Sequence, residues 1–256
     1  MDMGGFEMNN NIAIFGFNVS NLSVDTIVKN ALENNKLSVV NTINPHSYIE
    51  TKSDSGFYDA LQDSDILIPD GSGIVLAAKM VNKVKIGKIA GTDLFYESMK
   101  QLNTTNGKVF FLGSSDNVLK AMTEKGNNEF PNVSVQTLSP PYKAKFDQSD
   151  IDSFIKAINT FKPDVLFVGL TAPKQEKLIH QIKSQIDVKM VSGIGAVFDF
   201  YAGAVIRPHP FWLKLHLEWL VRLIGEPKRL WRRNFVSTPL FLLEIFLTKL
   251  GLKKFS

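Results

Sequence analysis

The chain alternates between short apolar segments and longer segments whose apolar residues recur at helical spacing. The apolar, β-rich segments lie at 37–44, 65–70, 108–114, 133–139, 164–170 and 189–195. The helical patterns lie at 24–35, 55–62, 73–81, 116–130, 149–161 and 173–186. Near-continuous apolar runs are typical of strands covered on both faces, and their alternation with helices indicates parallel pairing. The pattern therefore predicts an α/β fold, with a mostly parallel sheet and helices on both faces.

The charge is distributed unevenly along the 256 residues. Residues 207–256 hold ten Lys/Arg against three Asp/Glu, a net charge of +7, and all three tryptophans. The remaining residues hold 19 Lys/Arg against 22 Asp/Glu, a net charge of −3. This length suits one large domain with an appendage. We therefore predict an α/β domain at 1–206 and a helical, basic and aromatic appendage at 207–256.

Several classes of protein are disfavoured. Cysteine is absent, which excludes disulfides and thiolate metal ligands and fits a reducing cytoplasm. The histidines form no pair at metal-ligand spacing, and no run approaches the roughly 20 apolar residues of a spanning helix. No basic segment precedes an early apolar one, so no secretory signal is expected. Asp63-Ser64-Asp65 resembles a cation-binding DxD pattern, but it precedes a strand, and we interpret it as a helix exit.

Polar or glycine-rich turns follow the predicted strands. Ligands of parallel α/β sheets bind beyond the carboxyl ends of the strands, so these turns are the candidate site. Asp70-Gly71 either caps a helix or brings backbone and carboxylate to a ligand. Gly113-Ser114 either packs closely before a helix or holds a diphosphate. Neither turn is a P-loop or a dinucleotide fingerprint, which disfavours a nicotinamide oxidoreductase.

Two further turns carry polar side chains with open roles. Lys174 opens a predicted helix, where a cation opposes the helix dipole, so it either reaches water or meets an anion. Thr171 and Pro173 before it suit a cap and a first turn. Thr42 and Asn44 share one face if the strand continues, and they either bind a sugar or shape the turn.

The basic C-terminal segment has three interpretations. It is a helical lid or homo-oligomer contact, a nucleic-acid surface, or a set of interfacial helices on an anionic membrane. We favour the membrane, because basic and aromatic residues accompany apolar helical faces. No nucleic-acid-binding motif accompanies the charge, so no nucleic acid is expected as a partner.

An ordered set of motifs resembles the WecG/TagA/CpsF glycosyltransferases, which form glycosyltransferase family 26. The motifs are TINPH (42–46), ALQDSDILIPDGSGIVLAAK (60–79), GKIAGTDLF (87–95), FFLGSS (110–115), SPPY (139–142), DVLFVGLTAPKQE (164–176), GIGAVFDFYAG (193–203), RPHPFW (207–212) and LEWLVRLIGEPKRLWRR (217–233). Each motif is weak alone, but the ordered set is specific.

The resemblance implies a Rossmann-like catalytic domain that binds a nucleotide sugar. It implies transfer of a sugar, with inversion, from a UDP-sugar donor to a polyprenyl-diphosphate-linked glycan. Such enzymes work peripherally at the cytoplasmic face of the membrane, in cell-surface polysaccharide or teichoic acid synthesis, and need no metal or other cofactor. The donor sugar stays open among N-acetylmannosamine, its uronic acid, glucose and glucuronic acid. A rival from another class is a non-catalytic, nucleotide-binding regulator that docks on membranes.

The resemblance also implies roles for individual residues. Asp70 is the candidate general base, and Tyr142 and Asp199 are candidates for the nucleoside. The implied substrate-binding residues are Thr42, Asn44, Gly71, Lys88, Gly91, Asp93, Gly113, Ser114, Tyr142, Lys174, Gln175, Glu176, Gly195, Asp199, Arg207, Arg229, Arg232 and Arg233. Two positions depart from the family pattern, which usually has arginine where Lys88 stands and Arg-Ala-Pro where Arg207-Pro208-His209 stands. Lysine keeps the charge but loses the planar fork of arginine.

Overall fold

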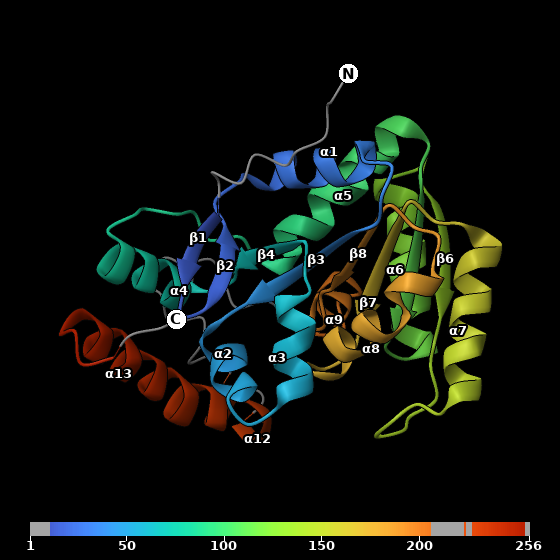
Figure 1. The fold of residues 1–256 in the computed structure, drawn as a ribbon. Coiled ribbons are helices and arrows are strands. Elements are labelled where there is room, and N and C mark those ends of the chain that lie inside the picture. Colours follow the sequence, from blue (N-terminus) through green and yellow to red (C-terminus); the bar gives the residue numbers. More distant parts are fainter. Residues whose placement is uncertain (1–10, 206–222, 224–226, 254–256) are drawn as a thin grey trace.

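The computed structural model describes residues 11–205, 223 and 227–253, and the side chains of Lys228 and Arg229 lie outside this description. The described residues form an eight-stranded sheet with the order β1-β2-β4-β3-β8-β7-β5-β6 (Figure 1). Within this described sheet, β1 pairs antiparallel with β2, and the other pairs are parallel. The strands are β1 Asn11–Ile14, β2 Phe17–Ser20, β3 Ser38–Ile43, β4 Ile66–Pro69, β5 Lys108–Gly113, β6 Ser134–Leu138, β7 Val165–Gly169 and β8 Met190–Gly193.

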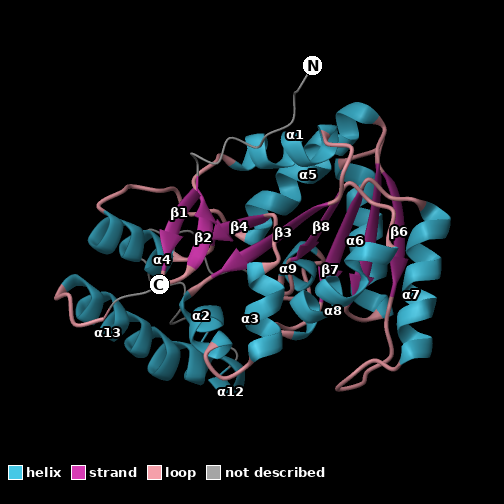
Figure 2. Ribbon diagram, in the orientation of Figure 1, coloured by secondary structure: helices cyan, strands magenta, loops and turns pink. Residues whose placement is uncertain are grey.

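Helices cover both faces of the sheet (Figure 2). They are α1 Val24–Glu33, α2 Pro45–Thr51, α3 Ser55–Gln62, α4 Ser72–Ala77, α5 Gly91–Thr105, α6 Asp116–Glu129, α7 Gln148–Phe161, α8 Lys174–Ile182, α9 Val197–Tyr201, α12 Pro227–Arg232 and α13 Thr238–Lys249. One core cluster joins the sheet to α1, α5, α6 and α9. A second joins it to α7 and α8, and α3 packs beside α8 on that same face. The predicted α/β fold is therefore confirmed.

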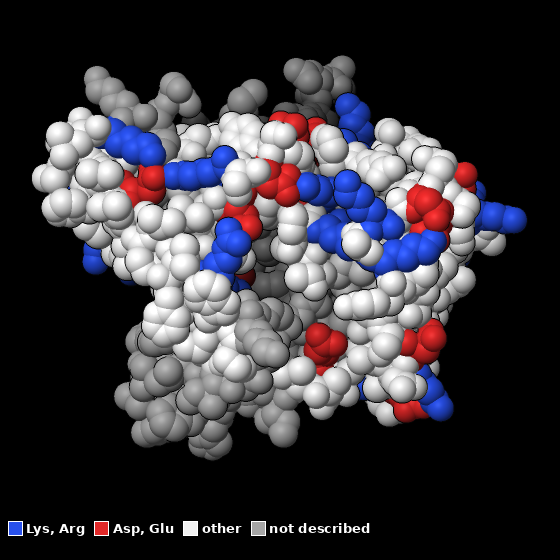
Figure 3. Space-filling view, turned by 90° about the horizontal axis from the view of Figure 1, so that it is seen from below, with Lys and Arg blue, Asp and Glu red and all other residues white. Residues whose placement is uncertain are grey.

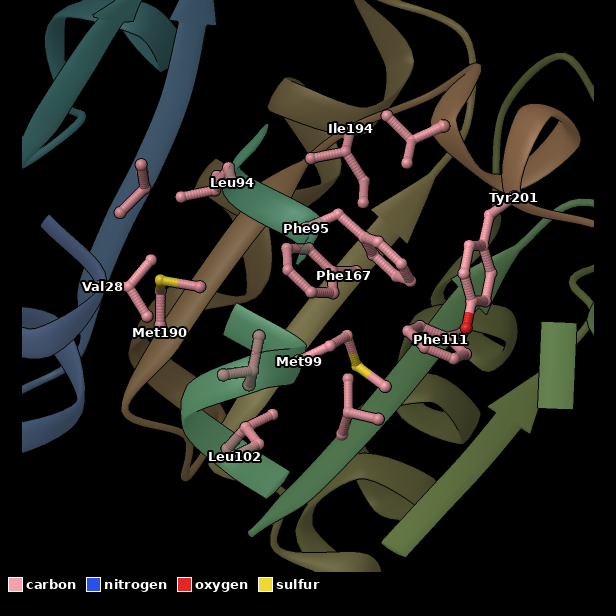
Figure 4. Packing of buried hydrophobic residues seen from close by; sticks show 14 of the residues in the cluster. Val28, Leu94, Phe95, Met99, Leu102, Phe111, Phe167, Met190, Ile194 and Tyr201 are labelled. Carbon is pink, nitrogen blue, oxygen red and sulfur yellow. The ribbon is translucent and has the colours of Figure 1, made fainter. Parts of the chain in front are cut away.

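The central strands show why their apolar runs are almost continuous. In β7, Phe167 packs in the cluster with α5 and α9, while its neighbours Leu166 and Val168 pack in the cluster with α7 and α8. Successive side chains of a strand point to opposite faces, so a strand buried on both faces needs apolar residues at every position. Figure 4 shows one side of this core, where Phe95 of α5 lies among Phe167, Phe111 and Tyr201.

The six predicted strands and six helical segments are all present, within a few residues of the expected bounds. The β1–β2 hairpin and helices α2, α5 and α9 had no predicted counterpart. The hairpin turns at Phe15-Gly16, where both residues have positive φ, as a two-residue turn between twisted strands requires. Helix α5 shows a helical period through Phe95, Met99 and Leu102, all of them buried.

The C-terminal helix α13 packs against the body of the protein. Its Phe241 is fully buried and contacts the rings of Phe15 and Tyr48, each at 5.4 Å between centroids. Ile245, one turn on, is buried in the same cluster. A segment from the end of the chain thus completes the core under β1, β2 and α2. The division at 206/207 stays a prediction, because residues 206–222 lie outside the described part.

Candidate active site

The predicted ligand-binding turns lie along one edge of the sheet. Strands β4, β3, β8, β7 and β5 are consecutive parallel neighbours, so their carboxyl ends lie side by side. The residues that end or follow these strands are, in that order, Asp70 and Gly71; Thr42 and Asn44; Gly195; Lys174, Gln175 and Glu176; and Gly113 and Ser114. Figure 3 looks at the molecule from this side, where basic and acidic side chains intermingle in a band and the surface is hollowed near the middle.

The topology places the centre of this edge between β3 and β8. After β3 the chain enters α2 and α3, and α3 packs beside α8. After β8 it enters α9, which packs with α5 and α6 on the opposite face. Neighbouring strands whose connections leave on opposite faces open a crevice, and ligands of α/β sheets bind in that crevice. Thr42, Asn44, Gly195 and Gln175 are thus at the position where a ligand is expected.

The turn after β4 brings Asp70 beside the end of β3. The backbone N–H of Asp70 donates to the carbonyl of Ile43 at 2.9 Å. Gly71, with φ of +88°, is the N-cap of α4, so the alternative in which Asp70 caps this helix is wrong. The first turn of α4 also lies against α2, since a Cβ on Gly73 would come within 2.3 Å of Pro45. This close approach holds the Asp70 turn next to Asn44.

The side chain of Asn44 caps α2. Its Oδ1 accepts from the backbone N–H groups of His46 and Ser47, each at 3.0 Å, and Ser47 Oγ in turn accepts from the N–H of Asn44. The turn-shaping interpretation is therefore confirmed for Asn44, while sugar binding stays a prediction. Thr42 is half-buried one strand from Asp70, in register with Ile68 of β4.

The segment before α5 returns to the same edge. The N–H of Ile89 donates to the carbonyl of Pro69 at 3.0 Å, which places the exposed Lys88 close to the end of β4. Asp93 accepts from the N–H of Ala90 at 2.8 Å, so its carboxylate organises the start of α5. Gly91 opens that helix against Val197 and Ile194.

Glycines let β5 and β7 approach closely at the other end of the edge. A Cβ on Gly113 would lie 2.4 Å from the carbonyl oxygen of Gly169, its register partner. Ser114 follows with φ of +59°, and its carbonyl accepts from Ser139 Oγ at 2.9 Å. Ser115 is the N-cap of α6 but makes no side-chain capping bond. The amides at the start of α6 are therefore left to other acceptors. Tyr142, in the loop after β6, is fully exposed.

Lys174 is partly exposed, and whether it meets an anion stays a prediction. Its Nζ donates to the backbone carbonyl of Lys143 and lies 3.7 Å from the ring centroid of Phe146. Partial burial lowers the pKa of this ammonium group, against the attraction of Asp150. Thr171 makes no capping bond, because α8 begins one residue after Pro173, its N-cap. The expectation that Thr171 caps α8 is wrong.

Gln175 and Glu176 open α8 and are buried, with exposed fractions of 5% and 3%. Gln175 Nε2 donates to Glu176 Oε1 at 2.9 Å. The Gln175 side chain lies across the end of β8, since a Cβ on Gly193 would come within 2.9 Å of it and one on Gly195 within 3.3 Å of Oε1. Burial raises the pKa of the Glu176 carboxyl to about 7, although hydrogen bonds from Gln175 and its own backbone act in the opposite direction.

The Asp63-Ser64-Asp65 segment is a helix exit, as expected. Asp63 is the C-cap of α3, and its carboxylate pairs with His180 at 2.7 Å and Lys183 at 2.5 Å. Asp65 accepts from the backbone N–H of Val39 at 2.7 Å. Both carboxylates thus hold the amino ends of strands and the neighbouring helix together, at the edge away from the candidate site.

Comparison with known proteins settles the family. The sequence profile described as "Glycosyl transferase WecG/TagA/CpsF family" matches residues 12–255. The chain belongs to this family. It is therefore a glycosyltransferase, as the motifs implied.

Three relatives of the chain are named N-acetylglucosaminyldiphosphoundecaprenol N-acetyl-beta-D-mannosaminyltransferase. The relative from Bacillus subtilis (strain 168) is 31% identical over 238 residues, covering 92% of this chain and 90% of the relative. The one from Bacillus spizizenii is 32% identical over 202 residues, covering 79% and 76%. The one from Staphylococcus aureus (strain MRSA252) is 29% identical over 232 residues, covering 91% and 88%.

The C-terminal arginines of this glycosyltransferase lie only partly within the described residues. Arg232 pairs with Glu50 of α2 at 3.4 Å, and Arg233 lies close enough to His46 to affect it. Burial lowers the pKa of His46, and the nearby Arg233 and Arg232 act in the same direction, whereas Glu50 opposes them. The Nδ1 atom of His46 lies 2.8 Å from Ser237 Oγ. Arg229 lies in α12, with its side chain outside the described part, and Arg207 lies outside it altogether. Asp199 lies in α9, after β8.

The structure adds residues that the motifs did not single out. Gly193 gives Gln175 its space, and Gly73 lets α4 approach α2. His46 and Glu50 connect α2 to the C-terminal helices. A signal was available for Gly193, because a glycine inside a strand often marks a close approach of another group. The partners of α2 had no signal, since they are about 190 residues away in sequence.

Proposed function

We propose that this glycosyltransferase transfers an N-acetylmannosaminyl group from a UDP-sugar to a polyprenyl-diphosphate-linked N-acetylglucosamine, with inversion at the anomeric carbon. The names of the relatives support the transferred sugar and the acceptor. An α-linked donor gives a β-linked product by inversion. The other sugars that the resemblance left open are outcomes of the assay described below.

The observation that carries the proposal is the position of Asp70. Its backbone is hydrogen-bonded to the end of β3, next to the crevice between β3 and β8, and the Asn44 cap holds the adjoining turn. A carboxylate at this point takes the proton from the acceptor hydroxyl as that oxygen attacks the anomeric carbon. General-base catalysis of this kind contributes about 10²–10⁴-fold to a rate. The proton passes to the Asp70 carboxylate, and the bond between the anomeric carbon and the nucleoside diphosphate breaks.

The departing diphosphate needs positive charge or amide donors. Lys88 is exposed near the end of β4, and the start of α6 has amides without a side-chain cap. Arg232 and Arg233 approach from the C-terminal helices. Cations and helix N-termini stabilise charge that develops on a leaving phosphate. This is the role we propose for Lys88, the 113–116 turn and the C-terminal arginines, including Arg207 and Arg229.

The lipid-linked acceptor gives a reason for the exposed apolar side of α13. Leu240, Leu242, Leu243 and Phe246 are between 43% and 56% exposed, opposite the buried Phe241. Lys52, Lys249 and Lys253 lie around this helix. A hollow of about 360 Å³ between α2 and the C-terminal helices is lined by Ile49, Val236 and Leu240. We propose that this side lies on an anionic membrane, at the cytoplasmic face. No helix among the described residues is long and apolar enough to span a bilayer.

The test is transfer itself. The full chain is incubated with UDP-N-acetylmannosamine and a lipid-diphosphate N-acetylglucosamine, and the lipid product is detected by mass. Parallel incubations contain UDP-glucose, UDP-glucuronic acid or the UDP-linked uronic acid of N-acetylmannosamine as the donor. Asp70→Asn is expected to remain folded and to lose at least about a hundredfold in turnover. Asp152→Asn, an exposed carboxylate on α7 bonded to Gln148, is the matched control and is expected to keep full turnover.

The same experiment separates two failures. Binding of UDP with no disaccharide lipid from any of these donors would contradict the proposed donor and acceptor. Near-normal turnover of Asp70→Asn would leave the chain a transferase but remove Asp70 from the mechanism. The two failures are therefore distinguishable.

A further inference from the structure

The start of α8 buries two polar side chains that only half satisfy one another. Gln175 Nε2 donates to Glu176 Oε1 at 2.9 Å. Gln175 Oε1 and Glu176 Oε2 are both inaccessible to solvent, and neither finds a hydrogen-bond partner among the described residues. Buried polar atoms are nearly always paired, so an unpaired carbonyl and an unpaired carboxylate oxygen side by side need an explanation. Both lie at the crevice where the glycosyltransferase is expected to hold its substrate.

The space around Gln175 is specifically cleared. Gly193 and Gly195 flank its side chain, and a Cβ at Gly193 would come within 2.9 Å of the Gln175 amide group. Gly195 has a φ of +42°, which favours glycine independently. The Gln175 amide is thus held flat across the end of β8, with one edge against Glu176 and the other edge toward Gly195.

An amide in this position has two orientations that differ by a half-turn. When Glu176 is ionised it only accepts, so Gln175 turns its NH₂ group to Glu176 and its carbonyl oxygen toward Gly195. When Glu176 is protonated it donates, so it can bond the Gln175 carbonyl, and the NH₂ group then turns toward Gly195. The donor and acceptor inventory of the two side chains dictates this pairing.

We propose that Glu176 is a positioning residue, whose protonation state decides whether Gln175 presents a carbonyl oxygen or an NH₂ group to the substrate at the end of β8. The ionised form suits a sugar hydroxyl or acetamido N–H, which donates. The protonated form suits a phosphate or carboxylate oxygen, which accepts. The inference rests on the proposed function only in that Gln175 contacts a substrate.

Among the described residues, no charged neighbour of Glu176 fixes its protonation state. Strands β3, β7 and β8 carry no charged side chain. The carboxylates that α3 presents to α8 have their own partners, since Asp54 pairs with Lys177 at 2.6 Å and Asp63 with Lys183 at 2.5 Å. Lys174 is turned away, to the carbonyl of Lys143.

Other carboxylates on this rim are Asp70 after β4, Asp93 in α5, Asp116 in α6 and Asp199 in α9. None of them is among the groups that shift the pKa of Glu176, which burial raises to about 7. The group therefore changes state close to neutral pH, where the enzyme is assayed.

The first arm of the test needs no activity. Side-chain amide signals of the full chain are followed by NMR from pH 5.5 to 8.5, with the Gln175 signal assigned by its loss in Gln175→Met. A shift of that signal with a midpoint near pH 7, absent in Glu176→Gln, is expected. A Gln175 signal that does not respond to pH would overturn the proposal, and so would one that responds equally in Glu176→Gln. Should either variant fail to fold, isotope labelling of glutamine and infrared detection of a titrating carboxyl group on the wild-type chain take its place.

The second arm uses the reaction. Between pH 6 and pH 8 the ionised fraction of a group with a pKa near 7 rises about tenfold. KM is therefore expected to fall about tenfold if the substrate donates a hydrogen bond to Gln175, and to rise about tenfold if the substrate accepts one from it. Glu176→Gln should flatten this change while the dependence of kcat on Asp70 persists. The control is Glu129→Gln, which removes a carboxylate of α6 that accepts from Tyr201 of α9. This variant should keep the change of KM with pH. A pH dependence of KM that survives in Glu176→Gln contradicts the proposal, whereas absence of transfer with every donor contradicts the proposed function alone.

Discussion

The buried carboxyl of Glu176 makes the stability of the protein depend on pH in a direction opposite to most carboxylates. Its pKa is about 7 in the folded protein against a reference value of 4.5. The folded state therefore binds the proton more tightly than the unfolded chain, and the associated stability, fully present below pH 4.5, is lost as pH rises through 7. Replacing Glu176 by glutamine, which is neutral at every pH, removes this dependence.

The magnitude follows from the two pKa values. One pKa unit corresponds to about 1.4 kcal/mol. Relative to its value at low pH, the free energy of unfolding is therefore lowered by the raised pKa of Glu176 by about 1 kcal/mol at pH 5 and about 3 kcal/mol at pH 8. The free energy of unfolding of Glu176→Gln, measured by urea denaturation relative to wild type, should therefore rise by roughly 2–3 kcal/mol between pH 5 and pH 8. Comparing the variant with wild type at each pH cancels the titration of other groups.

A matched control isolates the effect of burial. Glu129→Gln removes a carboxylate that is partly exposed and accepts from Tyr201 Oη at 3.1 Å. Its difference from wild type should change little between pH 5 and pH 8. A Glu176→Gln difference that is the same at both values would show that Glu176 is ionised and satisfied in the folded state, which refutes the reasoning from burial.

Two further predictions concern the space around Gln175 and the exposed side of α13. Gly193→Ala places a Cβ within 2.9 Å of Gln175, so transfer should fall at least about tenfold, with a stability loss of about 1–3 kcal/mol. The control is Gly126→Ala, whose Cβ meets only Tyr201 Oη at 3.8 Å and which should keep transfer. Equal activity of the two variants would show that Gln175 can move freely. The double variant Leu243→Glu with Phe246→Glu should release the folded protein from phosphatidylglycerol vesicles in co-sedimentation. Lys120→Glu, at an exposed position on α6, is the control and should not release it. Continued binding of the double variant would place the membrane contact elsewhere.

The sequence carried enough information to predict the sheet and the edge at which its ligand lies. The apolar run 164–170 became β7, because Leu166 and Phe167 each need burial on a different face. Once the strands are parallel, the turns after them must meet at one edge, and this brings Asp70 near Asn44 without knowledge of any side-chain contact. The order of the strands was not predictable, since it depends on which helices pack together across the sheet.

The burial and the protonation state of individual site residues were harder to predict from the sequence. Lys174, Gln175 and Glu176 are three polar residues in a row, and nothing local shows that the first reaches a carbonyl at the surface while the next two are buried. That outcome depends on Gly193 and Gly195, about 20 residues further on, because only glycine leaves room for the Gln175 side chain. A motif thus locates a site, but the protonation state of its groups follows from long-range packing.

Helix α13 shows the same limit for the C-terminal segment. Its residues 240–243 are Leu-Phe-Leu-Leu, so the helix is apolar nearly all round and has no periodicity that would indicate a buried face. The buried face is selected by a partner, because Phe241 fits between Phe15 of the hairpin and Tyr48 of α2. Deleting the C-terminal segment would therefore expose this core as well as remove the apolar surface. A truncated chain that failed to bind vesicles would not separate membrane docking from unfolding, whereas charge placed at Leu243 and Phe246 alters only the exposed side.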